Sequence, residues 1–245
     1  MAEQARWRRH ELGRFLEASL VTSVERDHTQ SDRAFRWRRL AAAATLLVGA
    51  VLLGWSLSLE PGDSRFYLAT TALAVVWAMG SFISGPLHLG WANTRSSGGH
   101  ARPVVQPLAL GLLAVTVFSA GAVLVAQIPF LRDEINDVLD HARFASLVVV
   151  AVIIVVNGIA EELFFRGALY AAIGRRYPVL ISTALYGVAT VATGNPMLVF
   201  AALALGLIVG LERRVTGGVL APIVTHVTWS LSMLFILPPL LTALA

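Results

Sequence analysis

Cysteine and lysine are both missing from this chain of 245 residues, and charged residues of any kind are scarce. Without cysteine, the chain has no disulfide framework, no thiol nucleophile and no cysteine-ligated metal centre. Charged residues make up 14% of the sequence and hydrophobic residues 56%, whereas soluble domains are about 25% charged and about 45–50% apolar. This composition excludes a large soluble catalytic domain and indicates a membrane protein.

The hydrophobic residues fall into seven runs, at roughly 41–59, 67–86, 104–127, 145–165, 178–193, 197–211 and 219–238. A helix that spans a bilayer needs about 20 apolar residues, and by this measure the fifth and sixth runs are short. Gly194, Asn195 and Pro196 are typical of a tight turn between these two runs. The expected fold is an all-α, polytopic membrane helix bundle with about seven transmembrane helices over residues 40–245.

The arginines are unevenly distributed along the chain. If the N-terminus is cytoplasmic and the chain crosses the membrane seven times, sixteen of the 19 arginines fall in cytoplasmic segments. The three others are Arg65, Arg132 and Arg143. Because cytoplasmic loops carry an excess of basic residues, we expect an N-in, C-out orientation in a plasma (inner) membrane. The basic balance therefore indicates orientation, and no nucleic-acid partner is expected.

Residues 1–39 are polar and contain nine arginines, and we expect them to form an uncleaved cytoplasmic tail. Five apolar residues fall near one face of a possible helix in this tail: Trp7, Leu12, Phe15, Leu16 and Leu20. This spacing is typical of an amphipathic helix at the membrane interface. A solvated, partly disordered tail is the alternative interpretation.

Two adjacent carboxylates follow an uncharged stretch that runs from residue 145 to residue 160. Ionisable groups inside a bilayer are costly, so Glu161 and Glu162 are candidates for function. On a helix, Glu162 and Arg166 stand four residues apart and can form an ion pair. Glu161 points about 100° away from Glu162, which lets it face the interior of the bundle. A purely structural ion pair at the helix end is the alternative for Glu162 and Arg166.

The seventh hydrophobic run contains a histidine, His226. Counted from the cytoplasmic edge, Glu161, Tyr186 and His226 lie at similar depths of roughly 10–12 Å, with Thr190 about one turn deeper. A carboxylate and an imidazole in a dry site can activate a water for attack on a carbonyl, and a nearby polar side chain can stabilise the oxyanion. A lone histidine that only hydrogen-bonds a neighbouring helix is the alternative.

Residues 161–167, EELFFRG, resemble the EExxxR motif of the CPBP intramembrane proteases. This family is related to the CAAX prenyl endopeptidase of the Ras-converting-enzyme type, and it includes bacterial abortive-infection proteins. Residues 220–226, LAPIVTH, are similar to the family's last motif, which places a CPBP-like core at about residues 145–238. The resemblance implies that Glu161 activates the water, that Glu162 and Arg166 support it, and that His226 is the last-motif histidine.

The chain departs from the family at two positions. The family's middle motif is Phe-x-x-x-His, and the matching residues here are Tyr186 and Thr190. In the last motif, Ser230 stands where the family usually has asparagine. Threonine has no proton equilibrium near neutral pH, so Thr190 cannot take over the role of a histidine base.

Two functions are compatible with these residues. One is an intramembrane endopeptidase that uses Glu161 and His226 near the cytoplasmic face to cleave a membrane-protein or lipidated-peptide substrate. Its supporting residues would be Glu162, Arg166, Tyr186, Thr190 and Ser230. The other is a catalytically degenerate relative that binds such a partner as a membrane scaffold or regulator. No cofactor is expected, and no metal, because the candidate ligands fall short of a typical catalytic zinc site.

Overall fold

The computed structural model describes residues 2–25, 28–93, 99–143 and 146–244, and the side chains of residues 2–10 and 142 lie outside this description. The elements are α1 (Ala2–Leu20), α2 (Asp32–Ser58), α3 (Arg65–Ser84), β1 (Ala92–Asn93), β2 (His100–Ala101), α4 (Val105–Val125), α5 (Pro129–Arg143), α6 (Leu147–Glu162), the π-helix η1 (Leu163–Leu169), α7 (Tyr170–Ile173), α8 (Pro178–Val191), α9 (Pro196–Thr216) and α10 (Leu220–Ala243). The strands pair antiparallel, with Ala92 opposite Ala101.

In the described part of the chain, seven apolar helices occupy the seven hydrophobic runs, and this confirms the all-α membrane fold. Six of them are long and apolar enough to cross a bilayer: α2, α3, α4, the continuous helix Leu147–Ile173, α9 and α10. The seventh, α8, has 14 residues and is shorter, as its run predicts. The protein is therefore a multi-pass membrane protein.

Several helices extend beyond their hydrophobic runs because polar residues continue them. Helix α2 begins at Asp32, where the Ser31 side chain accepts a hydrogen bond from the Ala34 amide, so residue 40 lies within this helix. Helix α9 continues through Arg213 and Arg214, whose positive charges suit the negative end of the helix dipole. It ends at Thr216, and the next residue, Gly217, has a φ of 71°, a left-handed conformation that glycine adopts at little cost.

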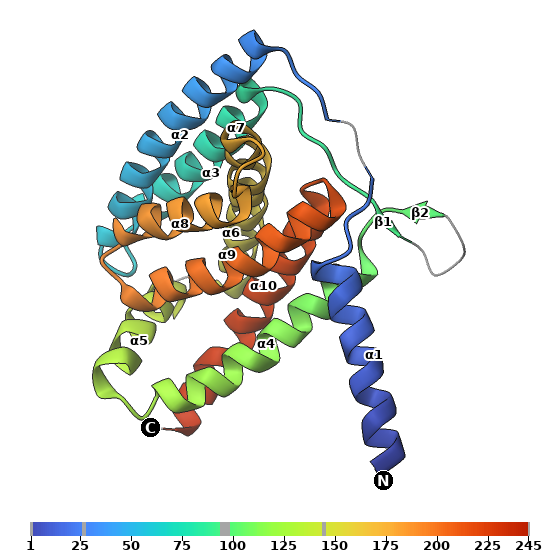
Figure 1. Ribbon diagram of the computed structural model, residues 1–245. Coiled ribbons are helices and arrows are strands. Elements are labelled where there is room, and N and C mark those ends of the chain that lie inside the picture. The colour runs from blue at the N-terminus through green and yellow to red at the C-terminus, as the bar shows by residue number, and fades with distance from the viewer. Residues whose placement is uncertain (1, 26–27, 94–98, 144–145, 245) are drawn as a thin grey trace.

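The helices pack as three pairs around a central helix. Helix α2 packs on α3, α4 on α10, and α8 on α9, while α6 contacts both α3 and α10. In Figure 1, the start of α2, the end of α3 and α7 lie at one end of the bundle, and α5 and the C-terminus lie at the other. The end of α6 is therefore surrounded by helices from three parts of the sequence.

A cluster of buried aromatic rings fixes the position of α6 and η1 against α3. Trp77 of α3 stacks on Phe164 with ring centroids 4.5 Å apart, and it contacts Phe165 at 5.1 Å. The neighbouring helix α2 passes close to the same indole at Gly49, where an added Cβ would lie 2.1 Å from the Trp77 ring. Such close packing leaves little freedom for the residues that precede Phe164.

The segment before the hairpin and the end of the N-terminal helix both lie against the junction between α9 and α10. The Val219 amide donates to the His88 carbonyl at 2.9 Å, and His88 stacks on His28 with centroids 3.8 Å apart. After α1, the Val24 amide donates to the Val215 carbonyl at 2.9 Å. Residues 2–20 are thus helical, whereas the membrane location of this tail stays a prediction.

Candidate active site

The two adjacent glutamates lie where the α-helix widens into a π-helix. Glu162 is the last residue of α6, and η1 begins at Leu163 and contains Arg166. The Nε of Arg213 donates to the Arg166 main-chain carbonyl at 2.6 Å, which ties η1 to α9. Short π-helical segments occur frequently at functional sites. The sequence did not predict this π-helix, because Leu163–Leu169 continues the preceding helix without a proline.

Glu162 is fully buried and has two polar partners on one carboxylate oxygen. Arg166 Nη1 donates to Glu162 Oε1 at 3.2 Å, which is the contact expected from the four-residue spacing. His226 Nδ1 lies 2.7 Å from the same oxygen. The last turn of α6 is therefore joined to α10 through a buried carboxylate and imidazole.

Glu161 faces a different helix. The Tyr186 hydroxyl of α8 donates to Glu161 Oε2 at 2.5 Å. The sequence leads us to expect Glu161 and His226 together, but the direct partner of His226 is Glu162. The reason is the rotation of about 100° between successive residues of a helix, which turns one carboxylate toward α8 and the other toward α10.

These groups still act on one another as a single cluster. Electrostatic interactions link Glu161 to His226, Glu162 and Arg166 as well as to its hydrogen-bond partner Tyr186. The Arg166 guanidinium lies 4.9 Å from the centroid of the Tyr186 ring, so it contacts both Glu162 and the tyrosine that binds Glu161. The structure thus brings together five of the seven candidate residues.

Thr190 and Ser230 are turned toward their own helices. The Thr190 hydroxyl donates to the Tyr186 carbonyl at 2.9 Å, and the Ser230 hydroxyl donates to the His226 carbonyl at 2.9 Å. Each of these bonds runs to the residue four positions earlier, the usual way in which a helix accommodates such hydroxyls. Their protons are therefore directed to the backbone, away from the two carboxylates.

Two glycines that carry no side-chain chemistry shape the cluster. An added Cβ at Gly206 of α9 would lie 2.9 Å from Arg166 Nη2, so only glycine lets the guanidinium lie this close to the helix. At Gly158, one turn before Glu162, a Cβ would lie 3.9 Å from His226 Nε2. Bare backbone therefore faces the imidazole edge. Small residues at contacts between membrane helices are the signal that points to such positions.

Several polar atoms of the cluster are buried without a hydrogen-bond partner. They are Glu162 Oε2, Arg166 Nε and Arg166 Nη2. The charges of Glu162 and Arg166 have opposite signs and lie in a medium of low dielectric constant. Their attraction is therefore strong, and the loss of either partner is costly. Among the residues that the structure describes, no three histidine, aspartate or glutamate side chains converge as metal ligands.

The fold and these contacts describe a multi-pass membrane protein with a buried cluster of two glutamates, an arginine, a tyrosine and a histidine. Residues 143–232 match the family described as Type II CAAX prenyl endopeptidase Rce1-like. This region is therefore Rce1-like, and the match confirms the resemblance to the CPBP membrane proteases. It contains all seven candidate site residues. No curated protein and no solved structure matches the chain.

Proposed function

We propose that the protein is an intramembrane endopeptidase that hydrolyses a peptide bond in a membrane-protein or lipidated-peptide substrate. The Rce1-like match supports a protease-like function of the CPBP type. The observation that carries the proposal is the division of partners: Glu161 is held by Tyr186, and His226 by Glu162. Two adjacent carboxylates thereby take different tasks in one dry site.

Glu161 acts as the general base in this proposal. Its Oε2 accepts a hydrogen bond from the Tyr186 hydroxyl, and Oε1 is the oxygen that takes a proton from the attacking water. The water oxygen forms the new bond to the carbonyl carbon of the scissile peptide. When the carbon–nitrogen bond breaks, the proton on Glu161 passes to the leaving amine. A base positioned in this way contributes typically 10²–10⁴-fold to the rate.

His226 stabilises the negative charge that develops on the carbonyl oxygen. Its Nδ1 is held by Glu162, so Nε2 is the nitrogen left to donate to the carbonyl oxygen. A buried carboxylate behind an imidazole fixes its orientation and stabilises its protonated form. A donor aimed at the developing oxyanion is worth more in a dry site than in water, since little solvent competes for it.

We also propose that the site opens toward the cytoplasm of a plasma (inner) membrane, with the N-terminus cytoplasmic and the C-terminus outside. The support is the distribution of arginines along the chain. Fusing a fluorescent protein that folds only in the cytoplasm to either end tests this orientation. Fluorescence at the N-terminal fusion alone is expected, and fluorescence at the C-terminal fusion would contradict the orientation.

A catalytically degenerate relative is the second candidate function. Thr190 and Ser230 stand where the family has histidine and asparagine, and both hydroxyls are bonded to their own helices. Such a protein would hold a membrane protein or a lipidated peptide without cleaving it. Stoichiometric recovery of a partner in mild detergent, from a protein with no hydrolytic activity, is the result expected from this function.

Cleavage of a prenylated CAAX-type peptide by the purified protein in liposomes decides between the two functions. Under the protease proposal, Glu161→Ala abolishes cleavage, while Glu134→Gln in α5 serves as a carboxylate control and leaves it unchanged. Equal cleavage by the wild type and Glu161→Ala would overturn the role of Glu161. If the wild type is inactive and Thr190→His gains activity, the chain is a degenerate relative with an otherwise intact site.

A further inference from the structure

A third carboxyl group is buried near the cluster and takes no part in the proposed reaction. Glu212 of α9 is only 2% exposed. One of its oxygens, Oε1, lies 2.9 Å from the Thr225 hydroxyl. The other, Oε2, is buried without a hydrogen-bond partner. Polar groups in such positions are rare and call for a physical explanation.

The two contacts of the Thr225 hydroxyl bear on the charge state of this carboxyl group. The Thr225 oxygen lies 3.0 Å from the Pro107 carbonyl and 2.9 Å from Glu212 Oε1. A hydroxyl has one proton to donate, and a carbonyl oxygen can only accept. With an ionised Glu212, the single Thr225 proton is shared between the Pro107 carbonyl and Glu212 Oε1. With a protonated Glu212, Thr225 donates to Pro107 and Glu212 donates to Thr225, so that each contact is a full two-centre bond, and the geometry favours this neutral form.

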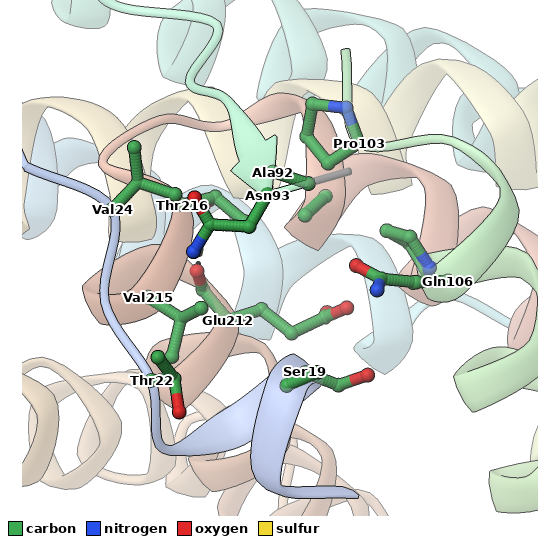
Figure 2. Close-up of a pocket in the computed structure, with 13 residues that line it drawn as sticks. Ser19, Thr22, Val24, Ala92, Asn93, Pro103, Gln106, Glu212, Val215 and Thr216 are labelled. Atoms are coloured by element: carbon green, nitrogen blue, oxygen red, sulfur yellow. Dashed lines mark hydrogen bonds between the residues drawn. The ribbon is translucent and has the colours of Figure 1, made fainter. Parts of the chain in front are cut away.

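Glu212 lines a small cavity beneath the N-terminal helix. Figure 2 shows the Glu212 carboxyl group between the Gln106 amide and the Ser19 hydroxyl, all of which line this cavity. Ser19 is only 5% exposed, and its hydroxyl oxygen is likewise buried without a hydrogen-bond partner. The cavity volume is about 10 Å³, which is at the lower limit of the space needed to hold one water molecule.

We propose that Glu212, Ser19 and Gln106 form a site for one proton and one water molecule, and that the bound proton keeps the end of α1 docked. The water would donate to Glu212 Oε2 and bond to the Ser19 hydroxyl, which satisfies both unpartnered atoms. The residues Ser19, Thr22 and Val24 close the cavity on one side. The site is thus completed only when the N-terminal segment is in place.

Loss of the proton would place a negative charge in a cavity whose lining contains no basic residue. Charged and titratable groups on the elements packed around it are Glu11, Arg14, Glu17, Glu25, His100, Arg102, Arg213, Arg214 and His226. Of these, Arg214 is directed to the Leu20 carbonyl and Arg213 to the Arg166 carbonyl. Glu162 is the charged group that acts on Glu212, and it has the same sign. Release of α1 lets water reach the carboxylate and relieves this cost.

The absence of cysteine makes accessibility a direct test. Val24→Cys reports on the cavity, since Val24 is 6% exposed, and Val21→Cys is the matched control, since Val21 is 61% exposed. The ratio of their maleimide labelling rates in the purified full-length protein removes the intrinsic effect of pH on thiol reactivity. Linkage to a single proton raises this ratio about tenfold per pH unit once Glu212 ionises. Glu212→Gln, which keeps a donor for Thr225, holds the ratio low at every pH.

A pH-independent ratio in the parent, or an identical rise in Glu212→Gln, would overturn the proposal. Labelling that follows the sodium concentration at fixed pH would assign the cavity to a metal cation and overturn it too. Ala69→Cys in α3, fully buried, reports unfolding of the bundle and must stay unlabelled. Infrared difference spectra between the parent and Glu212→Gln at neutral pH give a second readout. The carbonyl band of a protonated carboxylic acid is expected, and a carboxylate band in its place would contradict a bound proton.

Discussion

His226 hydrogen-bonds Glu162, and not Glu161, through its Nδ1 atom at 2.7 Å. The second glutamate of the motif therefore joins two helices and also pairs with Arg166, while the first is left to Tyr186. This division has consequences for stability and for catalysis that separate the two neighbouring residues.

Glu162→Gln should destabilise the protein far more than Glu161→Gln. The first change removes the charge that compensates the fully buried Arg166, and breaking a buried pair in this way costs about 3–5 kcal/mol. The second keeps an acceptor for the Tyr186 hydroxyl and should cost about 1 kcal/mol. Thermal unfolding in detergent, followed by circular dichroism, measures both. Equal losses for the two variants would contradict the difference in partners.

Tyr186→Phe should slow catalysis without loosening the fold. The ring keeps its contacts with Phe165 at 4.4 Å and with the Arg166 guanidinium at 4.9 Å, while the hydrogen bond to Glu161 is lost. The pH–rate profile of peptide cleavage should shift, because the hydrogen bond from the Tyr186 hydroxyl stabilises the ionised form of Glu161, the proposed base. Exposed Tyr177 provides the matched control, Tyr177→Phe, which should leave the profile in place. An unchanged profile in Tyr186→Phe would argue that Glu161 is not the base.

Gly206→Val should destabilise the bundle, whereas Gly121→Ala should stabilise it slightly. A Cβ at Gly206 would lie 2.9 Å from Arg166 Nη2, so extra methyl groups there force the buried ion pair apart, at about 1–3 kcal/mol. At Gly121 of α4 nothing lies within 4 Å of the added Cβ. Alanine there gains roughly 0.5–1 kcal/mol through helix propensity. Chemical denaturation of the two variants compares these effects, and a neutral Gly206→Val would contradict the packing.

Stability should fall as the pH drops below the ordinary pKa of histidine, in part through His88. Partial burial lowers the pKa of His88 from its usual 6.5, although the residue as a whole is exposed, and the charges of Arg213 and Arg38 lower it further. The unfolded chain therefore binds a proton in this window before the folded chain does, so stability rises with pH there and is complete above about 6.5.

His88→Gln should flatten this part of the stability–pH curve, while the same change at a second exposed histidine, His100→Gln, should leave it unchanged. Apparent unfolding temperatures between pH 5 and 8, a range of about three units around the histidine pKa, provide the measurement. An unaltered curve for His88→Gln would show that another group causes the loss.

Much of the site could be predicted because it depends on local spacing. Glu162 and Arg166 are four residues apart, and a helix brings such residues together whatever surrounds it. The partner of His226 could not be predicted in the same way. His226 lies 64 residues from Glu162, and which of two adjacent glutamates it meets depends on how α6 is rotated against α10.

The sequence by itself determined the membrane fold, since seven apolar runs in a chain with 14% charged residues can bury themselves only as helices in a bilayer. It also singled out the glutamates, because charge is conspicuous inside such runs. Only the tertiary structure decided the widening of the helix at Leu163, the pairing of His226 with Glu162, and the enclosure of Glu212 beneath α1. Each of these depends on contacts between helices distant in the chain, and helix packing, which periodicity does not encode, fixes those contacts.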